Sequence, residues 1–368
     1  MRLESIELKN YRNYTSAHIE PCAEVSVFAG NNAQGKTNIL EAVYLCCTGR
    51  SHRTQHDREL IKNGELSGSV KVDGLRRDGL HDVEIQLSCD GKRRIKVVGN
   101  TVSKSGELLG HITGVLFAPE DLRMVKDGPD VRRRFIDMEL SQLRPAYYYA
   151  LQRYNRALKQ RNTYLKECSL NGKSADMLEV WDLQLAQSGA QIMKARADFV
   201  GRLSQTAQEI HAAVADGREK LEVGYSPNVI SNGDTDEIES ALSDALLASR
   251  AGDIRRCITQ VGPHRDDISV KVDGLDARAY SSQGQVRTCA LSLKLSEIDI
   301  MKTVTGEPPV LMLDDVMSEL DPQRRRLLVS RLEGVQTLIT CTDKDDLAGA
   351  EIGKLFHVKN AVITETEI

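Results

Sequence analysis

The segment Gly30-Asn31-Asn32-Ala33-Gln34-Gly35-Lys36-Thr37 decides the fold, because it matches the pattern G-x-x-x-x-G-K-[ST] without deviation. A β-branched run at 25–28 precedes it, and a helical pattern of apolar residues begins at Lys36. Glycines in such a loop let backbone N–H groups close around phosphate oxygens, and the helix N-terminus adds positive partial charge. We therefore expect all eight residues to bind a nucleotide, with Lys36 on the β- and γ-phosphates and the Thr37 hydroxyl on Mg²⁺. The alternative is a glycine-rich turn without a ligand, which the order of strand, loop and helix disfavours.

A second motif supplies the carboxylates that a phosphate loop needs. The buried-strand run Val310-Leu311-Met312-Leu313 ends in Asp314 and Asp315. We expect Asp314 to bind Mg²⁺ through water and Asp315 to be the catalytic base that polarises the attacking water, with Lys36 as the other catalytic group. An aspartate pair that merely opens a turn after a core strand is the alternative.

The stretch Ser281-Ser282-Gln283-Gly284-Gln285 opens a helical pattern at 286–298 and resembles an anion site. One phosphate loop already serves one nucleotide, so we expect Ser282, Gly284 and Gln285 to cap the nucleotide of a neighbouring copy. The same residues are also ordinary helix capping. Residues 318–321 lie where a contact between the two copies would fall.

The length of 368 residues predicts two lobes, because one hydrophobic core seldom organises a chain of this size. Residues 1–130 and 254–368 have a mixed β/α pattern, with antiparallel strands expected at 69–100. Residues 131–253 are expected to form an inserted helical lobe. The heptad-like apolar pattern between about 132 and 215 breaks at Asn171-Gly172, which predicts a short antiparallel helical hairpin or two helices of an ordinary bundle. The fold class is therefore α/β with a helical insertion.

Composition excludes several classes of protein. No apolar run approaches the ~18 residues of a membrane span, and the first residues have no signal-peptide core. Eight cysteines without a C-x-x-C pair fit reduced thiols, so we expect a cytoplasmic protein. The net charge of −4 means that any nucleic-acid binding must come from a local patch.

Such a patch is expected at 132–166, which has nine Lys/Arg residues, two acids and half of the ten tyrosines. Basic residues interleaved with aromatic ones can follow a phosphate backbone and stack on unpaired bases, although the tyrosines fit a helix core at least as well. No base-reading motif occurs, so binding is expected to depend on the DNA backbone and structure. The residues expected to contact DNA are Arg50, Arg53, Arg132, Arg133, Arg134, Arg153, Arg156, Lys159 and Arg161.

The motifs also carry a family resemblance that extends from residue 1 to about residue 345. They are Leu8-Lys9-Asn10-Tyr11-Arg12-Asn13-Tyr14, the loop at 30–37, Gly49-Arg50-Ser51-His52-Arg53-Thr54, Pro119-Glu120-Asp121-Leu122, Arg132-Arg133-Arg134-Phe135-Ile136-Asp137, Gly262-Pro263-His264-Arg265-Asp266-Asp267, and the stretches 282–285 and 313–321. Together they resemble the ABC-type ATPases of the SMC class and, more narrowly, the RecF family of bacterial recombinational-repair ATPases.

The resemblance implies an ABC-type P-loop lobe, with a mixed sheet and flanking helices, that uses ATP and Mg²⁺. It implies that ATP closes a head-to-head homodimer on single-stranded, gapped or junction DNA, and that slow hydrolysis releases the DNA. It further implies partnership with RecR and RecO in loading RecA, support of stalled replication forks and induction of the SOS response. Arg12 and Arg265 are implied as nucleotide contacts.

Two departures from the wider ABC pattern predict slow hydrolysis, and we expect a weak, DNA-stimulated ATPase. The usual switch histidine is missing from Leu338-Ile339-Thr340-Cys341-Thr342-Asp343, and Asp315 replaces the usual glutamate. Near Pro119, Glu120 stands in place of the glutamine that typically senses the γ-phosphate. The missing histidine and the basic patch disfavour a transporter ATPase. The short interval between Lys36 and Asp314, without a Cys-x-x-Cys hook, disfavours a long-armed clamp.

Overall fold

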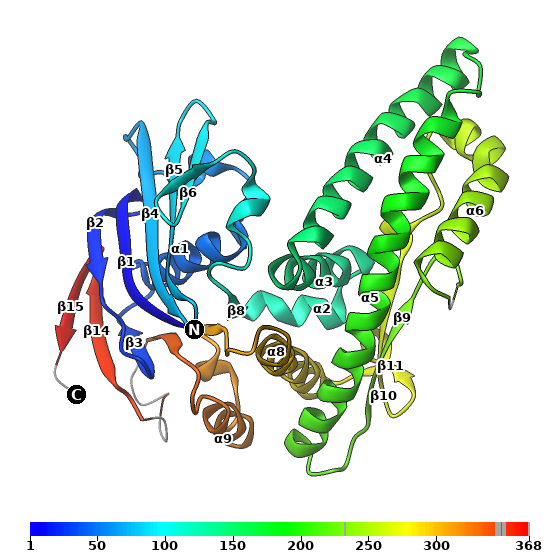
Figure 1. The fold of residues 1–368 in the computed structure, drawn as a ribbon. Helices are drawn as coiled ribbons and strands as arrows, with labels where there is room; N and C mark the ends of the chain where they lie inside the picture. Colours follow the sequence, from blue (N-terminus) through cyan, green and yellow to red (C-terminus); the bar gives the residue numbers. More distant parts are fainter. Residues whose placement is uncertain (232, 343–346, 348–350, 367–368) are drawn as a thin grey trace. The chain divides into compact units, whose positions relative to one another are not determined.

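A computed structural model describes residues 1–231, 233–342, 347 and 351–366. The chain divides into two compact units (Figure 1). Unit 1 comprises Met1–Leu122, Glu209–Arg218 and Gln283–Ile368, and unit 2 comprises Arg123–Gln208 and Glu219–Ser282. The expected boundaries at 131 and 254 are therefore displaced. The second one moves because a strand that follows residue 254 pairs with a strand of the inserted unit.

The first sheet of unit 1 is antiparallel, in the order β2-β1-β4-β5-β6-β7. Its strands are β1 (Arg2–Tyr11), β2 (Tyr14–Ile19), β4 (Ser67–Arg76), β5 (Gly79–Ser88), β6 (Arg93–Val97) and β7 (Asn100–Val102). Val70 and Val72 pair in register with Ile85 and Val83, and all four are buried. This alternation places one face of the sheet on the core and confirms the antiparallel strands expected at 69–100.

The second sheet of unit 1 is mixed, in the order β15-β14-β3-β13-β12-β8. Its strands are β3 (Val25–Ala29), β8 (Gly114–Phe117), β12 (Val310–Asp314), β13 (Thr337–Cys341), β14 (Lys354–Lys359) and β15 (Val362–Thr366). All neighbours are parallel except β15, which runs antiparallel to β14. β12 and β13 are buried along their whole length, as expected of parallel strands covered on both faces. The carboxyl ends of β3, β13 and β12 meet at one edge, which is where such sheets bind ligands.

The helices of unit 1 follow these strands. They are α1 (Lys36–Thr48), α8 (Gln283–Thr305) and α9 (Pro322–Ser330), with the short turns η1 (Asp57–Leu60), η2 (Ser105–Leu108), η3 (Pro119–Leu122) and η5 (Met317–Glu319). α1 contacts β4, β8, β12 and β13, and so packs between strands of both sheets. α1 begins at Lys36, the seventh of the eight residues of the phosphate loop.

Unit 2 is mainly helical, with a small antiparallel sheet in the order β11-β10-β9. Its elements are α2 (Arg123–Lys126), α3 (Pro129–Leu143), α4 (Pro145–Asn171), most of α5 (Leu178–Val214), β9 (Leu221–Ser226), α6 (Thr235–Arg256), η4 (Pro263–Arg265), β10 (Asp267–Val272), β11 (Leu275–Asp276) and α7 (Ala277–Tyr280). β10 pairs with β9, which explains why 254–282 belongs to this unit.

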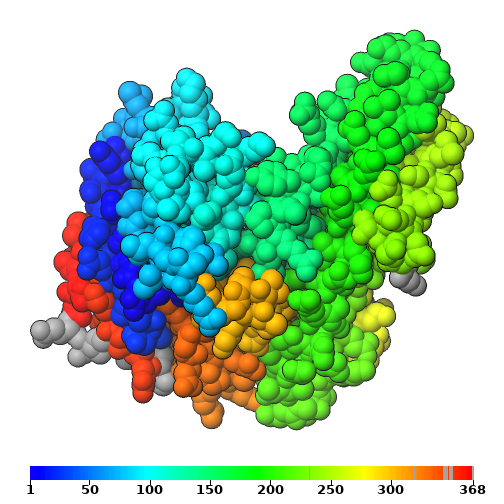
Figure 2. All heavy atoms as spheres, viewed as in Figure 1, coloured from blue at the N-terminus to red at the C-terminus, as the bar shows by residue number. Residues whose placement is uncertain are grey.

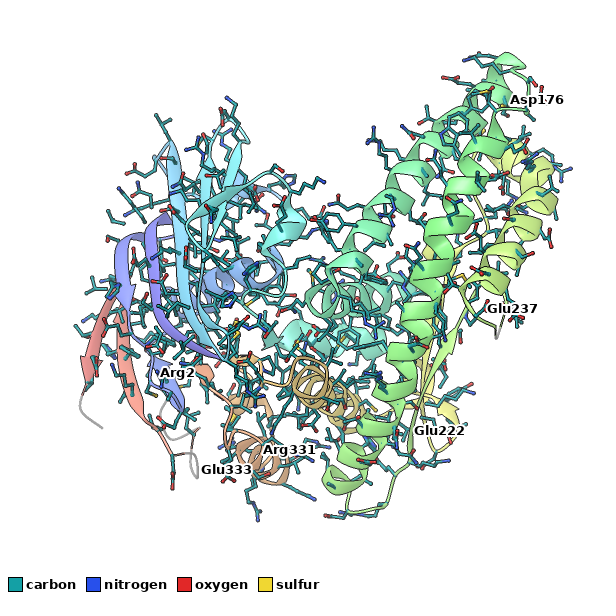
Figure 3. All side chains as sticks on the ribbon, viewed as in Figure 1. Arg2, Asp176, Glu222, Glu237, Arg331 and Glu333 are labelled. Atoms are coloured by element: carbon teal, nitrogen blue, oxygen red, sulfur yellow. The ribbon has the colours of Figure 1, made fainter. Side chains whose placement is uncertain are left out.

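The expected helical hairpin is formed by α4 and α5. Three contacts join them in antiparallel register: Arg153 with Gln191, Arg161 with Asp182, and Tyr164 with Trp181. α4 ends at Asn171 with Gly172 in the left-handed region, and Asp176 marks the connecting turn in Figure 3. α6 adds a third helix, since Arg250 binds Asp182 and α4 contacts α6. No helix in the described part of the chain is long and apolar enough to cross a membrane.

Candidate nucleotide site

The phosphate loop connects β3 to α1 and depends on its two glycines. A Cβ on Gly30 would lie 2.3 Å from the carbonyl oxygen of Val358 on β14. Gly35 has φ 115°, and a Cβ there would lie within 3 Å of the side chains of Asn13 and Tyr14. Any larger residue at either position would therefore displace the loop from the sheet.

The turn between β1 and β2 holds this loop in place. Asn13 donates to the carbonyl oxygen of Gln34 at 3.1 Å and accepts from Asn38 at 2.8 Å. The Tyr14 hydroxyl donates to the carbonyl oxygen of Gly35 at 3.1 Å. Because these hydrogen bonds come from side chains of one short turn, that turn holds the loop and the start of α1 before a ligand arrives. Sequence reasoning quoted Asn13 and Tyr14 only as part of a motif and missed this role.

Lys36 lies folded back on its own loop. Its Nζ donates to the carbonyl oxygens of Gly30 at 2.5 Å and Asn31 at 3.0 Å, and the residue is only 7% exposed. Burial lowers the pKa of Lys36, and the nearby carboxylates of Asp315 and Asp314 oppose that shift. The ammonium group is thus held at the centre of the loop, where a phosphate would replace the two carbonyl oxygens as its partner.

Asp314 joins the end of β12 to the start of α1. Its Oδ1 accepts from Thr37 Oγ1 at 2.9 Å and from Thr340 Oγ1 at 2.7 Å. Burial raises the pKa of Asp314, the two threonine hydrogen bonds oppose the shift, and the nearby Glu120 adds to it. The structure therefore brings together the two residues expected to bind Mg²⁺, with Glu120 of η3 close enough to affect their charge.

Asp315 follows in a strained conformation with an unused oxygen. Its φ is 54°, in the left-handed region that aspartate tolerates better than most residues. Its N–H donates to Thr340 Oγ1 at 2.9 Å, whereas its Oδ1 is buried and has no hydrogen-bond partner among the described residues. A buried acceptor without a donor is rare and marks a place for a water or an ion. Beside it, Thr37 and Asp314 form an all-oxygen pair, which fits Mg²⁺.

A buried glutamate organises the arginines beside the loop. Glu41 on α1 is fully buried and accepts from Arg12 Nε at 2.8 Å and Arg12 Nη2 at 2.6 Å. Ser51 Oγ donates to it at 2.6 Å, and Arg53 Nη1 lies 3.6 Å away. Burial alone would raise the pKa of Glu41, but the hydrogen bonds from Arg12 and Ser51 outweigh it, so the pKa lies below its ordinary value. The sequence offered no sign of Glu41, because its role exists only through these contacts.

The stretch 282–285 lies at the start of α8, which begins at Gln283 rather than at the expected residue 286. Ser282 is exposed, and Gly284 and Gln285 are half-buried in the first turn. Arg324 of α9 donates to the carbonyl oxygen of Gly284 at 3.0 Å and so fixes this turn. In the nearby stretch 318–321, Ser318 is exposed and Asp321 caps α9. Asp343, in the segment without a switch histidine, lies outside the described residues.

Most side chains expected to contact DNA are exposed on their own unit. These are Arg50, Arg53, Arg134, Arg153, Arg156 and Lys159. Arg133 is half-buried and bonded to Asp130 and to the carbonyl oxygen of Asp266.

Arg132 and Arg161 correct the expectation. Arg132 is 7% exposed and forms a two-pronged pair with Asp267 at 2.8 and 2.9 Å. Arg161 is fully buried between Asp182 at 2.6 Å and Asp253 at 2.7 Å. Both arginines hold the core of unit 2 together, because a buried guanidinium needs carboxylate partners. Neither is available to DNA in this structure.

The five tyrosines of α4 are all buried or half-buried. Tyr147 and Tyr154 are buried and hydrogen-bonded to Asp137 and His264, so they are core residues. Tyr164 packs beside Trp181 within the hairpin.

The segment 262–267 organises the core of unit 2. Pro263 and Asp266 accept from the buried Arg196 at 2.7 and 3.2 Å. Asp267 binds Arg132, and His264 binds Tyr154. Arg265 is exposed, and its guanidinium donates to the carbonyl oxygen of Thr259 at 3.2 Å. The motif therefore has a structural role, which leaves Arg265 at the surface of unit 2.

Comparison with known proteins places this site in a family. The chain matches the family model described as the RecF/RecN/SMC N terminal domain over residues 2–364. It is 44% identical over 363 residues to the DNA replication and repair protein RecF of Acetivibrio thermocellus, covering 98% of each chain. It is 43% identical over 360 residues to the protein of the same name from Agathobacter rectalis, covering 97% of each.

Solved structures agree. The recombination mediator protein RecF-ATP of the RecFOR pathway superimposes with a TM-score of 0.93 at 38% identity, covering all of this chain and 98% of that one. The SMC head domain of Pyrococcus furiosus, at 14% identity and a TM-score of 0.58 over 100% of this chain and 96% of that one, shares the fold alone. Site geometry, sequence identity along nearly the whole chain and a common fold agree: this chain belongs to the RecF family of ABC/SMC-type ATPases.

Proposed function

We propose that this protein is an ATP-gated DNA-binding protein of recombinational repair. The observation that carries the proposal is the hydrogen-bonded pair of Thr37 and Asp314 beside a preformed phosphate loop. An oxygen set at the end of a parallel strand, next to a lysine, is the arrangement that binds a magnesium-bound nucleoside triphosphate. The RecF relatives and the RecF-ATP structure support ATP as that nucleotide.

The residues of the loop have separate tasks in nucleotide binding. The backbone N–H groups of 30–37 surround the phosphates, and Lys36 exchanges the carbonyl oxygens of Gly30 and Asn31 for phosphate oxygens. Thr37 and Asp314 hold Mg²⁺, which neutralises charge on the β- and γ-phosphates. Arg12, in the turn between β1 and β2, would contact the nucleotide as well.

Hydrolysis is assigned to Asp315. Its buried Oδ1, which has no partner in the part of the chain that the structure describes, can accept a hydrogen bond, and we expect it to orient the attacking water. An aspartate reaches less far than the glutamate that ABC-type ATPases usually have at this position, so hydrolysis should be slow. We also expect DNA to stimulate it. The protein then works as a nucleotide-gated switch.

The gate is a homodimer. Ser282, Gly284 and Gln285 at the start of α8 would cap the nucleotide of a second copy, because an exposed hydroxyl beside a helix N-terminus favours an anion. Closure would hold single-stranded, gapped or junction DNA, with Arg50, Arg53, Arg133, Arg134, Arg153, Arg156 and Lys159 as contacts. As in the RecFOR pathway of the solved relative, RecO and RecR would be partners in loading RecA, with consequences for stalled forks and the SOS response. The eight cysteines are unbridged, which favours the cytosol as the place of action.

Sedimentation velocity tests the gate. The wild-type protein should double its mass with ATP and Mg²⁺, and Ser282→Arg should stay monomeric while still binding ATP. An exposed serine can be replaced without loss of the fold, so a change in mass reports on the contact itself. The same mass for the wild-type protein with and without ATP would refute the nucleotide-gated dimer.

A further inference from the structure

A polar groove of about 450 Å³ lies between α4 and α5 on the surface of unit 2. Its walls are the two helices of the hairpin, which appear in green in Figure 2. The lining residues are all polar, and they are Arg153, Arg156 and Gln160 from α4 with Gln184, Gln187, Ser188 and Gln191 from α5. An interhelical groove is normally closed by apolar side chains, so a polar lining of this size needs a reason.

The lining has positive charge and no negative charge. Arg153 and Arg156 are exposed on α4, and that helix has no Asp or Glu from Arg144 to Lys166. Arg161, one turn further along, lies on the inner face and is neutralised by buried Asp182 and Asp253. The positive charge of Arg153 and Arg156, on the outer face, is available to a ligand, and so the groove favours an anion.

The opposite wall adds amides rather than charge. Gln184, Gln187 and Gln191 recur three and four residues apart, so they lie on one face of α5. Gln191 Oε1 accepts from Arg153 Nη2 at 3.1 Å, which shows that the two walls are within reach of each other. A glutamine amide both donates and accepts, and so it can bind phosphate and sugar oxygens as well as base edges.

We propose that this groove binds the sugar–phosphate backbone of one nucleic-acid strand, with Arg153 and Arg156 on phosphates and the α5 glutamines on sugars or bases. Residues 153–160 span about 10 Å at 1.5 Å per residue, the length of about three stacked nucleotides at 3.4 Å each. An acidic peptide fits less well, because each carboxylate would demand a cation and most of the lining is neutral amide. The inference rests on the proposed DNA binding and assigns it a location and a chemistry.

The salt dependence of DNA affinity separates the two walls. Affinity for a single-stranded oligonucleotide and for a gapped duplex is measured with ATP and Mg²⁺ at several salt concentrations. Arg153→Gln and Arg156→Gln should each reduce the slope of log K against log salt by about 0.7 to 0.9, the value for one lost phosphate contact. Gln187→Ala should weaken binding about five-fold with the slope unchanged, because a neutral hydrogen bond releases no counterion. Arg255→Gln, an exposed arginine of α6 outside the groove, is the matched control and should bind like wild type.

The outcomes distinguish this inference from the proposed function. If the wild-type protein binds no DNA in any nucleotide state, the proposed function itself fails. If the wild-type protein binds DNA and all groove variants keep its affinity and slope, only the groove assignment is overturned. If the groove variants lose binding to a poly-aspartate peptide but keep their DNA binding, the groove is a protein-docking site. That result would also overturn the groove assignment.

Discussion

Thr37 at the first turn of α1 donates a 2.9 Å hydrogen bond to Asp314 at the end of β12, across a sequence separation of 277 residues. Thr340 of β13 donates to the same oxygen, so three parts of unit 1 meet at one carboxylate. The oxygen atoms that Mg²⁺ would need are therefore held by the protein before the ion binds. A nucleotide-gated switch requires such preorganisation, because closure of the proposed dimer then depends only on the binding of the nucleotide and its metal ion.

Lys36→Met should abolish most ATP binding. The substitution removes the ammonium that donates to the carbonyl oxygens of Gly30 and Asn31 in the loop. Loss of one charged hydrogen-bonding group predicts a roughly 10- to 100-fold weaker affinity for ATP. Equilibrium binding of a fluorescent ATP analogue measures it, and Lys92→Met, an exposed lysine of the same unit, is the control. Unchanged affinity in Lys36→Met would remove the loop from the site.

Asp314→Asn and Asp315→Asn should differ. Asp314→Asn weakens Mg²⁺-dependent ATP binding, because Asp314 holds Thr37 and would bind the ion. Asp315→Asn should keep ATP affinity and lower the hydrolysis rate by about 10²-fold or more, as expected for a lost general base. Steady-state phosphate release and ATP binding measured together decide between the two roles. Equal hydrolysis by Asp315→Asn and wild type would show that Asp315 is not the base.

These residues show what local sequence can predict. The strand and helix on either side of the loop at 30–37, and the buried strand that ends at Asp314, were predicted correctly because each is a run of neighbouring residues with a fixed pattern. The helical hairpin was predicted from its apolar period and its break at Gly172. Neither needs knowledge of distant contacts.

The errors arose where distant partners decide the outcome. Arg132 and Arg161 were counted as surface charge because their own neighbourhood is basic, yet their partners Asp267 and Asp253 lie 135 and 92 residues away. Glu41 and Asn13 were missed for the same reason, since their importance lies in what they touch. A buried ion pair between segments far apart has no local pattern, and so charge counted along the chain overestimates the charge on the surface.

Glu41→Gln should lower the free energy of unfolding and make that free energy depend less on pH in the acid range. Replacing one partner of a buried pair leaves Arg12 poorly compensated, which costs about 3 kcal/mol. The pKa of Glu41 in the folded protein lies below its ordinary value of 4.5, so its stabilising contribution is complete above that pH. It is lost as the pH falls through the folded-state pKa, because the unfolded chain takes up the proton first. Urea unfolding at pH 7 and at pH 4 measures both effects, and an unchanged free energy of unfolding at pH 7 would contradict the assignment.

His264→Gln should remove a different pH dependence. His264 Nε2 faces the carbonyl oxygen of Thr259 at 3.0 Å and must carry a proton, so Nδ1 accepts from the Tyr154 hydroxyl at 2.6 Å. Burial lowers the pKa of His264 to about 4. Between pH 6.5 and 4 the unfolded state therefore holds the extra proton, and the free energy of unfolding falls as the pH falls.

A glutamine can make both hydrogen bonds without titrating, so His264→Gln should lose less stability than wild type between pH 6.5 and 4. NMR titration of the histidine ring protons checks the cause directly. A ring pKa near 6.5 in the folded protein would contradict the buried, neutral assignment.

Whether ATP gates DNA binding is decided by the affinity for a gapped duplex, measured with ATP, with ADP and without nucleotide at one fixed salt concentration. It is measured for the wild-type protein, Lys36→Met and Ser282→Arg. We expect ATP to tighten DNA binding by the wild-type protein. Both substitutions should abolish the gain, since Lys36→Met removes the nucleotide and Ser282→Arg removes the cap from the second copy. Equal DNA affinity in all three nucleotide states, in a wild-type protein that still hydrolyses ATP, would contradict gating by ATP.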